Sequence, residues 1–174
     1  MTPSLLKKIT LSARILLILL MAATVVFIFV NSTFPPDKSQ QQSDTVKDAI
    51  LEILPEDSYA AEAVENDIRK VAHFTEYGLL GIELAVYLFI FERRRPWLLP
   101  AALLLPLFVG FIDESIQITS GRGPAISDVW IDIGGFATFY HLALAVLYLG
   151  LLAFLLVGRI VARAKKRTTE NNNG

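Results

Sequence analysis

Four long apolar runs are the feature that most constrains the fold of this chain of 174 residues. They cover residues 15–34, 71–91, 97–119 and 133–157. Each is long enough to cross a hydrocarbon core of about 30 Å as a helix. Unpaired backbone groups are costly in lipid, so such runs cross a membrane as helices. The sequence therefore predicts an all-α, polytopic membrane protein with four transmembrane helices.

The first and third runs contain further local signals. The first is longer than the apolar region of a signal peptide and offers no small-residue cleavage site, which favours a membrane anchor. The third contains Pro100 and Pro106. Neighbouring helices satisfy the backbone groups that a proline frees within a span, so we expect a kinked third helix.

Composition excludes several functions. Charged residues make up only 19% of the chain, below the roughly one quarter that is usual in soluble domains. The 16 basic and 17 acidic side chains nearly balance, which excludes an electrostatically driven nucleic-acid binder. Cysteine is absent, which excludes disulfides, thiolate metal sites and cysteine nucleophiles.

The charges between the runs predict the orientation, because short cytoplasmic loops carry the excess of lysine and arginine. Segment 35–70 has nine acidic and four basic residues and is placed outside. Both termini are therefore predicted to be cytoplasmic. The basic residues that support this are Lys7, Lys8 and Arg14 before the first run, Arg93, Arg94 and Arg95 after the second, and Arg159, Arg163, Lys165, Lys166 and Arg167 after the fourth.

The acidic outer loop is expected to be partly helical. Residues 39–43 (SQQQS) suggest a polar linker, and residues 45–54 place apolar side chains on one helical face that ends at Pro55. This segment suits an amphipathic helix on the outer membrane surface; a lid over a site is the alternative. Residues 168–174 (TTENNNG) suggest a disordered tail.

These boundaries divide the chain into five parts. They are a basic cytoplasmic N-terminus (1–14), the first transmembrane helix (15–34), an acidic extracytoplasmic loop (35–69), a core with three transmembrane helices (70–157), and a basic, then disordered, cytoplasmic tail (158–174).

Ionisable and polar residues gather at the predicted outer ends of the second, third and fourth spans. Such residues within a span are functional candidates by default. They are Lys70, His73, Glu76, Tyr77, Asp113, Glu114, Gln117, Asp128 and Asp132, with Arg122 in the intervening loop. A buried ion-pair network that joins the helices is the structural alternative. Five carboxylates face two cations and one histidine, and this imbalance favours an outward-facing polar pocket. Glu83 lies two turns further inward and has no evident partner.

Residue chemistry suggests three groups of roles. Candidates for a general acid and base are His73, Glu76 and Glu114. Candidates for substrate binding are Lys70, Tyr77, Gln117 and Arg122. Candidates for metal ligands are Asp113, Asp128 and Asp132, whose oxygens suit Mg²⁺ or Ca²⁺.

In these segments the chain resembles the VanZ-like family of small bacterial membrane proteins. The match comprises RKxxHFxEYxxLG from Arg69, DExxQ from Asp113, Gly121-Arg122 and Ser127-Asp128-Val129, then Asp132 and Gly135, and it covers about residues 69–140. One departure is Phe139, where the family commonly has a small residue, and it puts close packing of the fourth helix in doubt. The resemblance implies a protein of the bacterial cytoplasmic (inner) membrane that modulates sensitivity to lipophilic glycopeptides of the teicoplanin type.

Two functions remain open at this point. The pocket binds or remodels a lipid or lipid-linked component of the cell envelope, or it catalyses a metal-assisted or acid–base reaction on such a substrate. The alternative to both is a small transporter or structural membrane subunit that acts as a homo-oligomer, because four spans are few for a complete transporter.

Overall fold

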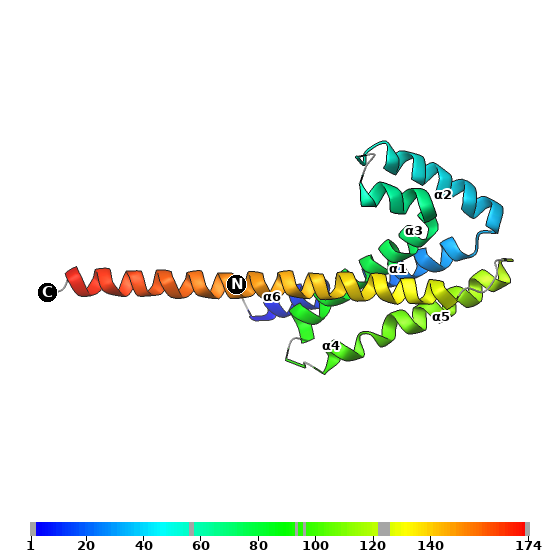
Figure 1. Cartoon of the computed structure of the whole chain (residues 1–174). Coiled ribbons are helices and arrows are strands. Elements are labelled where there is room, and N and C mark those ends of the chain that lie inside the picture. Colours follow the sequence, from blue (N-terminus) through cyan, green and yellow to red (C-terminus); the bar gives the residue numbers. More distant parts are fainter. Residues whose placement is uncertain (1–2, 56–57, 93, 96, 122–125, 173–174) are drawn as a thin grey trace.

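The structure of the protein is a computed structural model that describes residues 3–55, 58–92, 94–95, 97–121 and 126–172. Over these residues the chain forms helices joined by turns, without a β-strand (Figure 1). The predicted all-α class is therefore confirmed.

Four helical segments within the described ranges are long and apolar enough to cross a membrane, as predicted. They are Ile9–Ser32, Asp67–Glu92, Leu98–Thr119 and Ile126–Arg163. Large apolar side chains remain exposed along these helices, as expected for surfaces in contact with lipid.

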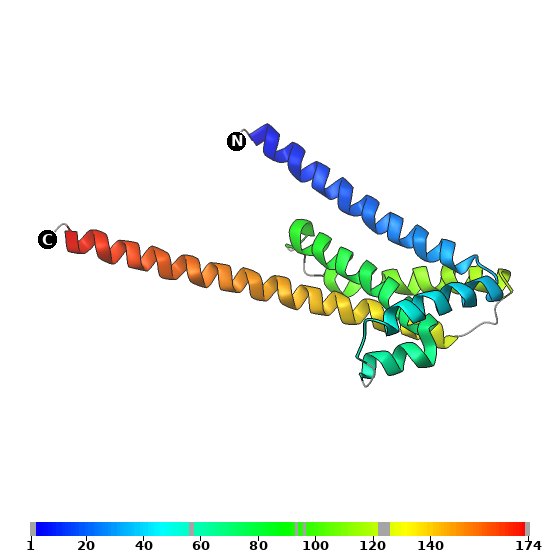
Figure 2. The same cartoon turned by 90° about the horizontal axis from the view of Figure 1, so that it is seen from above.

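The four spans run in alternating directions. They comprise α1 (Pro3–Ser32), α3 (Tyr59–Tyr87) with the π-helix η1 (Leu88–Glu92), α4 (Leu98–Ala101) with α5 (Leu104–Thr119), and α6 (Ile126–Asn172). α1 begins and α6 ends at the same end of the bundle (Figure 2). The opposite end of the bundle contains the last residues of α1 and α5 and the first residues of α6. We call it the polar end.

The third span is interrupted, as its prolines predict. α4 ends at Ala101 and α5 begins at Leu104, with Pro100 in the first segment and a buried Pro106 in the second. The hydroxyl of Tyr140, on α6, donates a hydrogen bond of 3.1 Å to the carbonyl of Leu99. A side chain of a neighbouring helix thus satisfies a backbone carbonyl next to the break.

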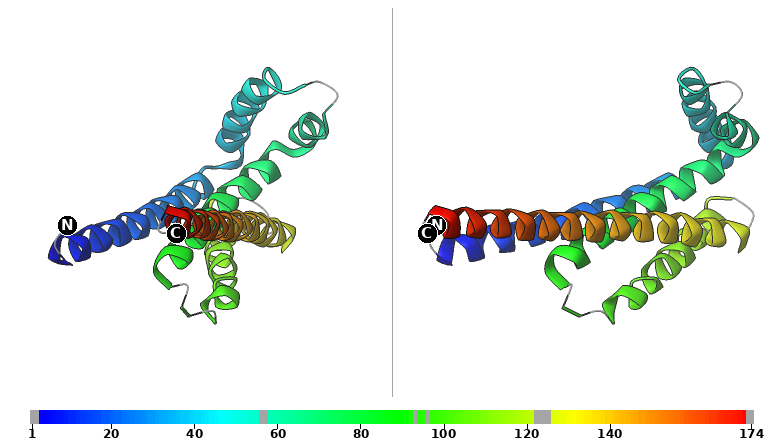
Figure 3. Two further views of the ribbon diagram at one scale, coloured as in Figure 1. Left: turned by 90° about the vertical axis from the view of Figure 1, so that its left-hand side faces the viewer. Right: turned by 60° about the vertical axis from the view of Figure 1, so that its left-hand side comes forward.

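The segment between the first two spans forms a helical hairpin. α2 covers Pro36–Leu51, so the prediction of a linker at residues 39–43 is wrong. Proline suits the first turn of a helix, and Gln40 donates to Asp44 one turn later, which extends the helix through the polar stretch. α2 and the first part of α3 stand away from the bundle (Figure 3). The backbone of α3 is non-helical at Asp67, where this arm meets the span.

α6 is longer than the predicted fourth span. It begins at Ile126 and continues to Asn172, through a segment that the sequence suggests is disordered. Alanine, arginine, lysine and glutamate are strong helix formers, and no proline follows Pro124, so nothing in the sequence stops the helix early.

α3 and α6 form the closest helix pair in the bundle. A Cβ on Gly135 would lie 2.8 Å from the Cα of Phe74, and one on Gly81 would lie 3.2 Å from the backbone nitrogen of Tyr140. Glycine at these points lets the two backbones approach closely. The departure at Phe139 does not prevent this, because its ring packs over Gly78 instead.

Candidate functional site

Three ionisable side chains from three different spans meet at the polar end. Nδ1 of His73, on α3, lies 3.2 Å from Oδ1 of Asp132 on α6 and 3.7 Å from Oδ2 of Asp113 on α5. Asp113 and Asp132 are only 1% and 2% exposed. We call these three residues the His–Asp cluster. The three residues therefore lie together at the polar end.

Polar side chains around the cluster hold Asp113 in place. Nε2 of Gln117, one turn along α5, donates a hydrogen bond of 2.9 Å to Oδ2 of Asp113. The hydroxyl of Ser32, at the end of α1, hydrogen-bonds Oδ1 of the same carboxylate. Both oxygens of Asp113 are therefore oriented before any ligand arrives.

Glu76 and Tyr77 lie on the next turn of α3. Nδ2 of Asn31 donates a hydrogen bond of 2.8 Å to Oε1 of Glu76, which links the ends of α1 and α3. Tyr77 is fully buried, and its hydroxyl faces the carboxylate of Asp132 without a hydrogen bond of normal geometry to any described residue. Both this hydroxyl and the carboxylate of Asp132 face Gly110 on α5. A Cβ added to Gly110 would lie 3.8 Å from the hydroxyl oxygen and 3.4 Å from Oδ2 of Asp132. The hydroxyl of Tyr77 therefore lies beside the cluster.

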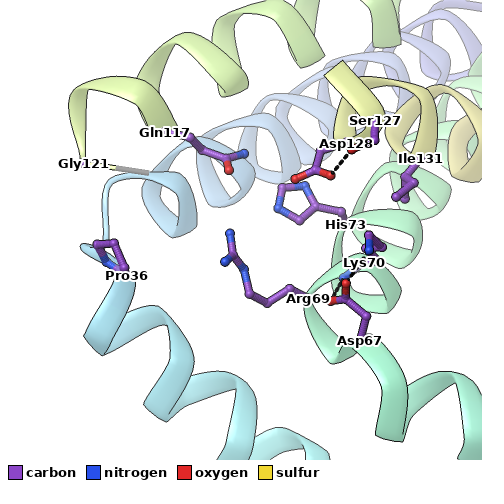
Figure 4. A pocket seen from close by; sticks show the side chains of 10 residues that line it. All are labelled: Pro36, Asp67, Arg69, Lys70, His73, Gln117, Gly121, Ser127, Asp128 and Ile131. Atoms are coloured by element: carbon purple, nitrogen blue, oxygen red, sulfur yellow. Dashed lines mark hydrogen bonds and ion pairs between the residues drawn. The ribbon is translucent and has the colours of Figure 1, made fainter. Parts of the chain in front are cut away.

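A cavity of about 430 Å³ opens beside the cluster, and Figure 4 shows the side chains that line it. His73 and Gln117 form part of its wall. Arg69 extends its guanidinium into the cavity (Figure 4) and forms no ion pair with a carboxylate of the described residues. The cavity thus presents the cation of Arg69 beside the His–Asp cluster.

A second cavity, of about 550 Å³, lies between α1, α2 and α3. Its lining combines apolar side chains, among them Phe27, Val46 and Ile68, with Arg69 and His73. Two residues of the polar cavity therefore also line a more apolar one. α2 contributes lining residues to both cavities.

The remaining predicted site residues lie around the cavity or outside the described ranges. Nζ of Lys70 pairs with Oδ2 of Asp67 at 2.6 Å, and Asp128 accepts a hydrogen bond of 3.1 Å from Ser127. Both Lys70 and Asp128 line the 430 Å³ cavity. Glu114 is half-buried on α5. Arg122 lies outside the described residues.

The predicted set of metal ligands changes in one member. Among the described residues, His73, Asp113 and Asp132 offer ligand atoms that all lie within 4.8 Å of one another. Asp128 does not join them, because its carboxylate stands at the exposed start of α6 beside Ser127. The i and i+4 spacing of Asp128 and Asp132 indicated a shared helical face, but only the second lies at the depth of the cluster.

Several residues of the site could not be recognised from the ionisable residues of the last three spans. Asn31 and Ser32 come from the first span, where their only signal is a polar triplet at the end of an apolar run. Arg69 begins the RKxxHFxEYxxLG motif, but it lies before the second apolar run, where its charge is interpreted as that of a loop residue. The sequence suggests no partner for Glu83, and the structure supplies one, because Oε1 of Glu83 accepts a hydrogen bond of 2.9 Å from the hydroxyl of Thr24 on α1.

The fold and the site together define an all-helical, multi-pass membrane protein with a buried histidine–carboxylate cluster at one end of its spans. The sequence pattern of the VanZ/LLP1 family matches residues 15–149, and the chain belongs to this family. Searches among curated proteins and among solved structures gave no match.

Proposed function

We propose that this protein binds the phosphate-bearing headgroup of a lipid, or of a lipid-linked envelope precursor, at the polar end of its bundle. The observation that carries the proposal is the guanidinium of Arg69, which extends into the 430 Å³ cavity and forms no ion pair with a carboxylate of the described residues. A guanidinium matches two oxygens of a phosphate group. The adjoining 550 Å³ cavity offers apolar surface to the chain that follows such a headgroup.

The polar end is proposed to face the outside of a bacterial cytoplasmic membrane. The lysine and arginine clusters lie before the first span, after the second and after the fourth, and the acidic segment lies between the first and second. The excess of basic residues marks the cytoplasmic side. In this orientation the cavity opens on the leaflet that presents envelope precursors to extracellular antibiotics.

The cellular consequence is a change in sensitivity to lipophilic glycopeptides of the teicoplanin type. A protein that occupies a precursor headgroup or its lipid anchor alters the access of an antibiotic that needs both the precursor and the membrane. This role requires binding and no covalent chemistry.

The first experiment measures teicoplanin sensitivity in a susceptible host that expresses wild type, Arg69→Gln or His73→Ala. Arg94→Gln, an exposed residue outside the site, is the control. Membrane abundance is matched by immunoblot. We expect protection by wild type and the control, and loss of most protection in the two site variants. Equal protection by all four would refute the role of the cavity.

A second experiment identifies what is bound. The full chain is purified in mild detergent, and the lipids that accompany it are measured by mass spectrometry. Polyprenyl phosphates, glycerophospholipids and added inorganic phosphate are compared as three arms. Enrichment of a phosphate-bearing lipid in wild type and its loss in Arg69→Gln is the expected result. Identical lipid profiles in both would count against the proposal.

A further inference from the structure

We propose that His73, Asp113 and Asp132 bind a divalent metal ion beside the 430 Å³ cavity, which His73 also lines. The proposal stands on the geometry of the His–Asp cluster alone and is independent of whether a lipid binds. It replaces the set of three aspartates that the sequence suggests with a mixed set of one imidazole and two carboxylates.

The separations within the cluster suit ligands of one ion. A ligand oxygen or nitrogen about 2.1 Å from a metal ion lies about 3.0 to 3.4 Å from its neighbour at angles between octahedral and tetrahedral. Nδ1 of His73 lies 3.2 Å from Oδ1 of Asp132, inside this interval. Its distance of 3.7 Å from Oδ2 of Asp113 exceeds the interval by a few tenths of an ångström. All three ligand atoms lie within 4.8 Å of one another, so side-chain rotations would be needed to bring them onto one ion.

A proton on His73 is a poorer partner for these two carboxylates than a metal ion. Both face the same nitrogen, Nδ1, which carries at most one proton. One proton gives one well-directed hydrogen bond, to Asp132, and leaves Asp113 with only the neutral donors Gln117 and Ser32. A cation placed between the three atoms contacts both carboxylates and leaves Nδ1 unprotonated.

The surroundings have the features of a second coordination shell. Gln117 and Ser32 donate to the two oxygens of Asp113 and so fix its orientation. Hydrogen-bonded ligand carboxylates are typical of metal sites. The buried hydroxyl of Tyr77 faces the carboxylate of Asp132, and it forms no hydrogen bond of normal geometry among the described residues. This polar atom is a second sign, beside the ligand distances, that the cluster takes a further polar partner.

The ligand types indicate which ions fit. Carboxylate oxygens suit Mg²⁺, Ca²⁺ and Mn²⁺, whereas imidazole suits Zn²⁺ and other transition metals. One nitrogen and two carboxylate oxygens therefore favour a transition-metal ion such as Mn²⁺ or Zn²⁺ over the Mg²⁺ or Ca²⁺ that three aspartates suggest. His73 is the residue that makes this difference.

The test titrates Mn²⁺ alone into the full-length protein in detergent, after removal of metal with EDTA. Loss of the electron paramagnetic resonance signal of free Mn²⁺ gives stoichiometry and affinity. Electron spin-echo modulation of the bound ion reports whether a nitrogen is coordinated. The variants are Asp132→Asn, Asp113→Asn and His73→Gln. Glu83→Gln is the control, because it neutralises another buried carboxyl, which is bound to Thr24 and outside the cluster.

We expect one Mn²⁺ per wild-type chain with nitrogen modulation, the same result for Glu83→Gln, and at least tenfold weaker binding in each cluster variant. His73→Gln should also lose the nitrogen signal. Absence of stoichiometric binding in wild type, or binding that the cluster variants leave unchanged, would overturn the proposal. If a variant elutes as aggregate in size-exclusion chromatography, the wild-type stoichiometry and nitrogen signal decide alone.

This result separates from that of the proposed function. Metal binding is measured without lipid, and Arg69→Gln is expected to keep it, because Arg69 is not among the ligands. Retained Mn²⁺ binding with unchanged lipid and teicoplanin profiles would support the metal centre and reject the lipid role. Absence of Mn²⁺ binding, together with lipid and teicoplanin profiles that change in Arg69→Gln, would support the lipid role and reject the metal centre.

Discussion

Nδ1 of His73 and Oδ1 of Asp132 lie 3.2 Å apart, although the two residues are separated by 59 positions in the chain. The contact spans the interface between α3 and α6. It depends on glycines that let the two backbones approach, since a side chain on Gly135 would meet the backbone of Phe74, next to His73. Helix packing and the candidate site are therefore coupled.

Substitution of Gly135 by alanine tests this coupling. A Cβ there would lie 2.8 Å from the Cα of Phe74, and backbone cannot move aside as a flexible side chain can. We expect the free energy of unfolding to fall by about 1–3 kcal/mol, the usual range for overpacking. Thermal unfolding in detergent, followed by tryptophan fluorescence, measures the effect.

Gly150→Ala is the matched control for this substitution. Gly150 lies on the same helix, and no described atom beyond its own stretch of α6 lies within 4 Å of the position that its Cβ would take. Alanine is the better helix former, so the melting temperature should stay the same or rise slightly. A Gly135→Ala protein as stable as the control would contradict the close approach of α3 and α6.

The hydrogen bond from Ser32 makes the first span part of the site. Ser32→Ala removes a donor from the buried carboxylate of Asp113 while leaving Gln117 in place. Loss of one partner from a buried polar group costs about 1–3 kcal/mol. Thr33→Ala is the control, because Thr33 is exposed just after the end of α1 and its hydroxyl donates to the carbonyl of Val30. Equal melting temperatures for the two variants would remove Ser32 from the site.

At the opposite end of the bundle Arg14 joins α1 to the end of the second span. Its guanidinium bonds the hydroxyl of Tyr87 at 2.9 Å and pairs with Glu92. In a double-variant cycle of Arg14→Gln and Glu92→Gln, the double variant should lose less stability than the two single losses added together. The measurement is thermal unfolding of all four proteins. Additive losses would show that the pair makes no net contribution.

The absence of cysteine permits a direct test of orientation. Gln41→Cys places a thiol on exposed α2, and Arg94→Cys places one between the second and third spans. A membrane-impermeant maleimide should label the first in intact cells and the second only after permeabilisation. The opposite pattern would place the polar end, and its cavity, on the cytoplasmic side.

Particular elements show how far the sequence could predict the structure. The lengths of the apolar runs were sufficient to predict the four spans, because a segment that crosses the hydrocarbon core must be a helix of about 20 residues. The prolines at 100 and 106 were sufficient for the break in the third span. The helix through residues 39–43 was missed, because polar composition allows both a linker and a helix. Tertiary contacts with α3 add to helix stability in a way that a local pattern cannot represent.

For the site, the sequence by itself determined that ionisable side chains of the last three spans lie near one end of the bundle, because alternating spans bring those segments to the same depth. Only the tertiary structure decided which of them meet. Rotation of each helix about its axis turns Asp132 towards His73 and leaves Asp128 at the cavity rim, and it brings Ser32 of the first span to Asp113. For α3 and α6 that rotation follows from the glycines and aromatic rings packed between them, and a hydropathy pattern does not contain it.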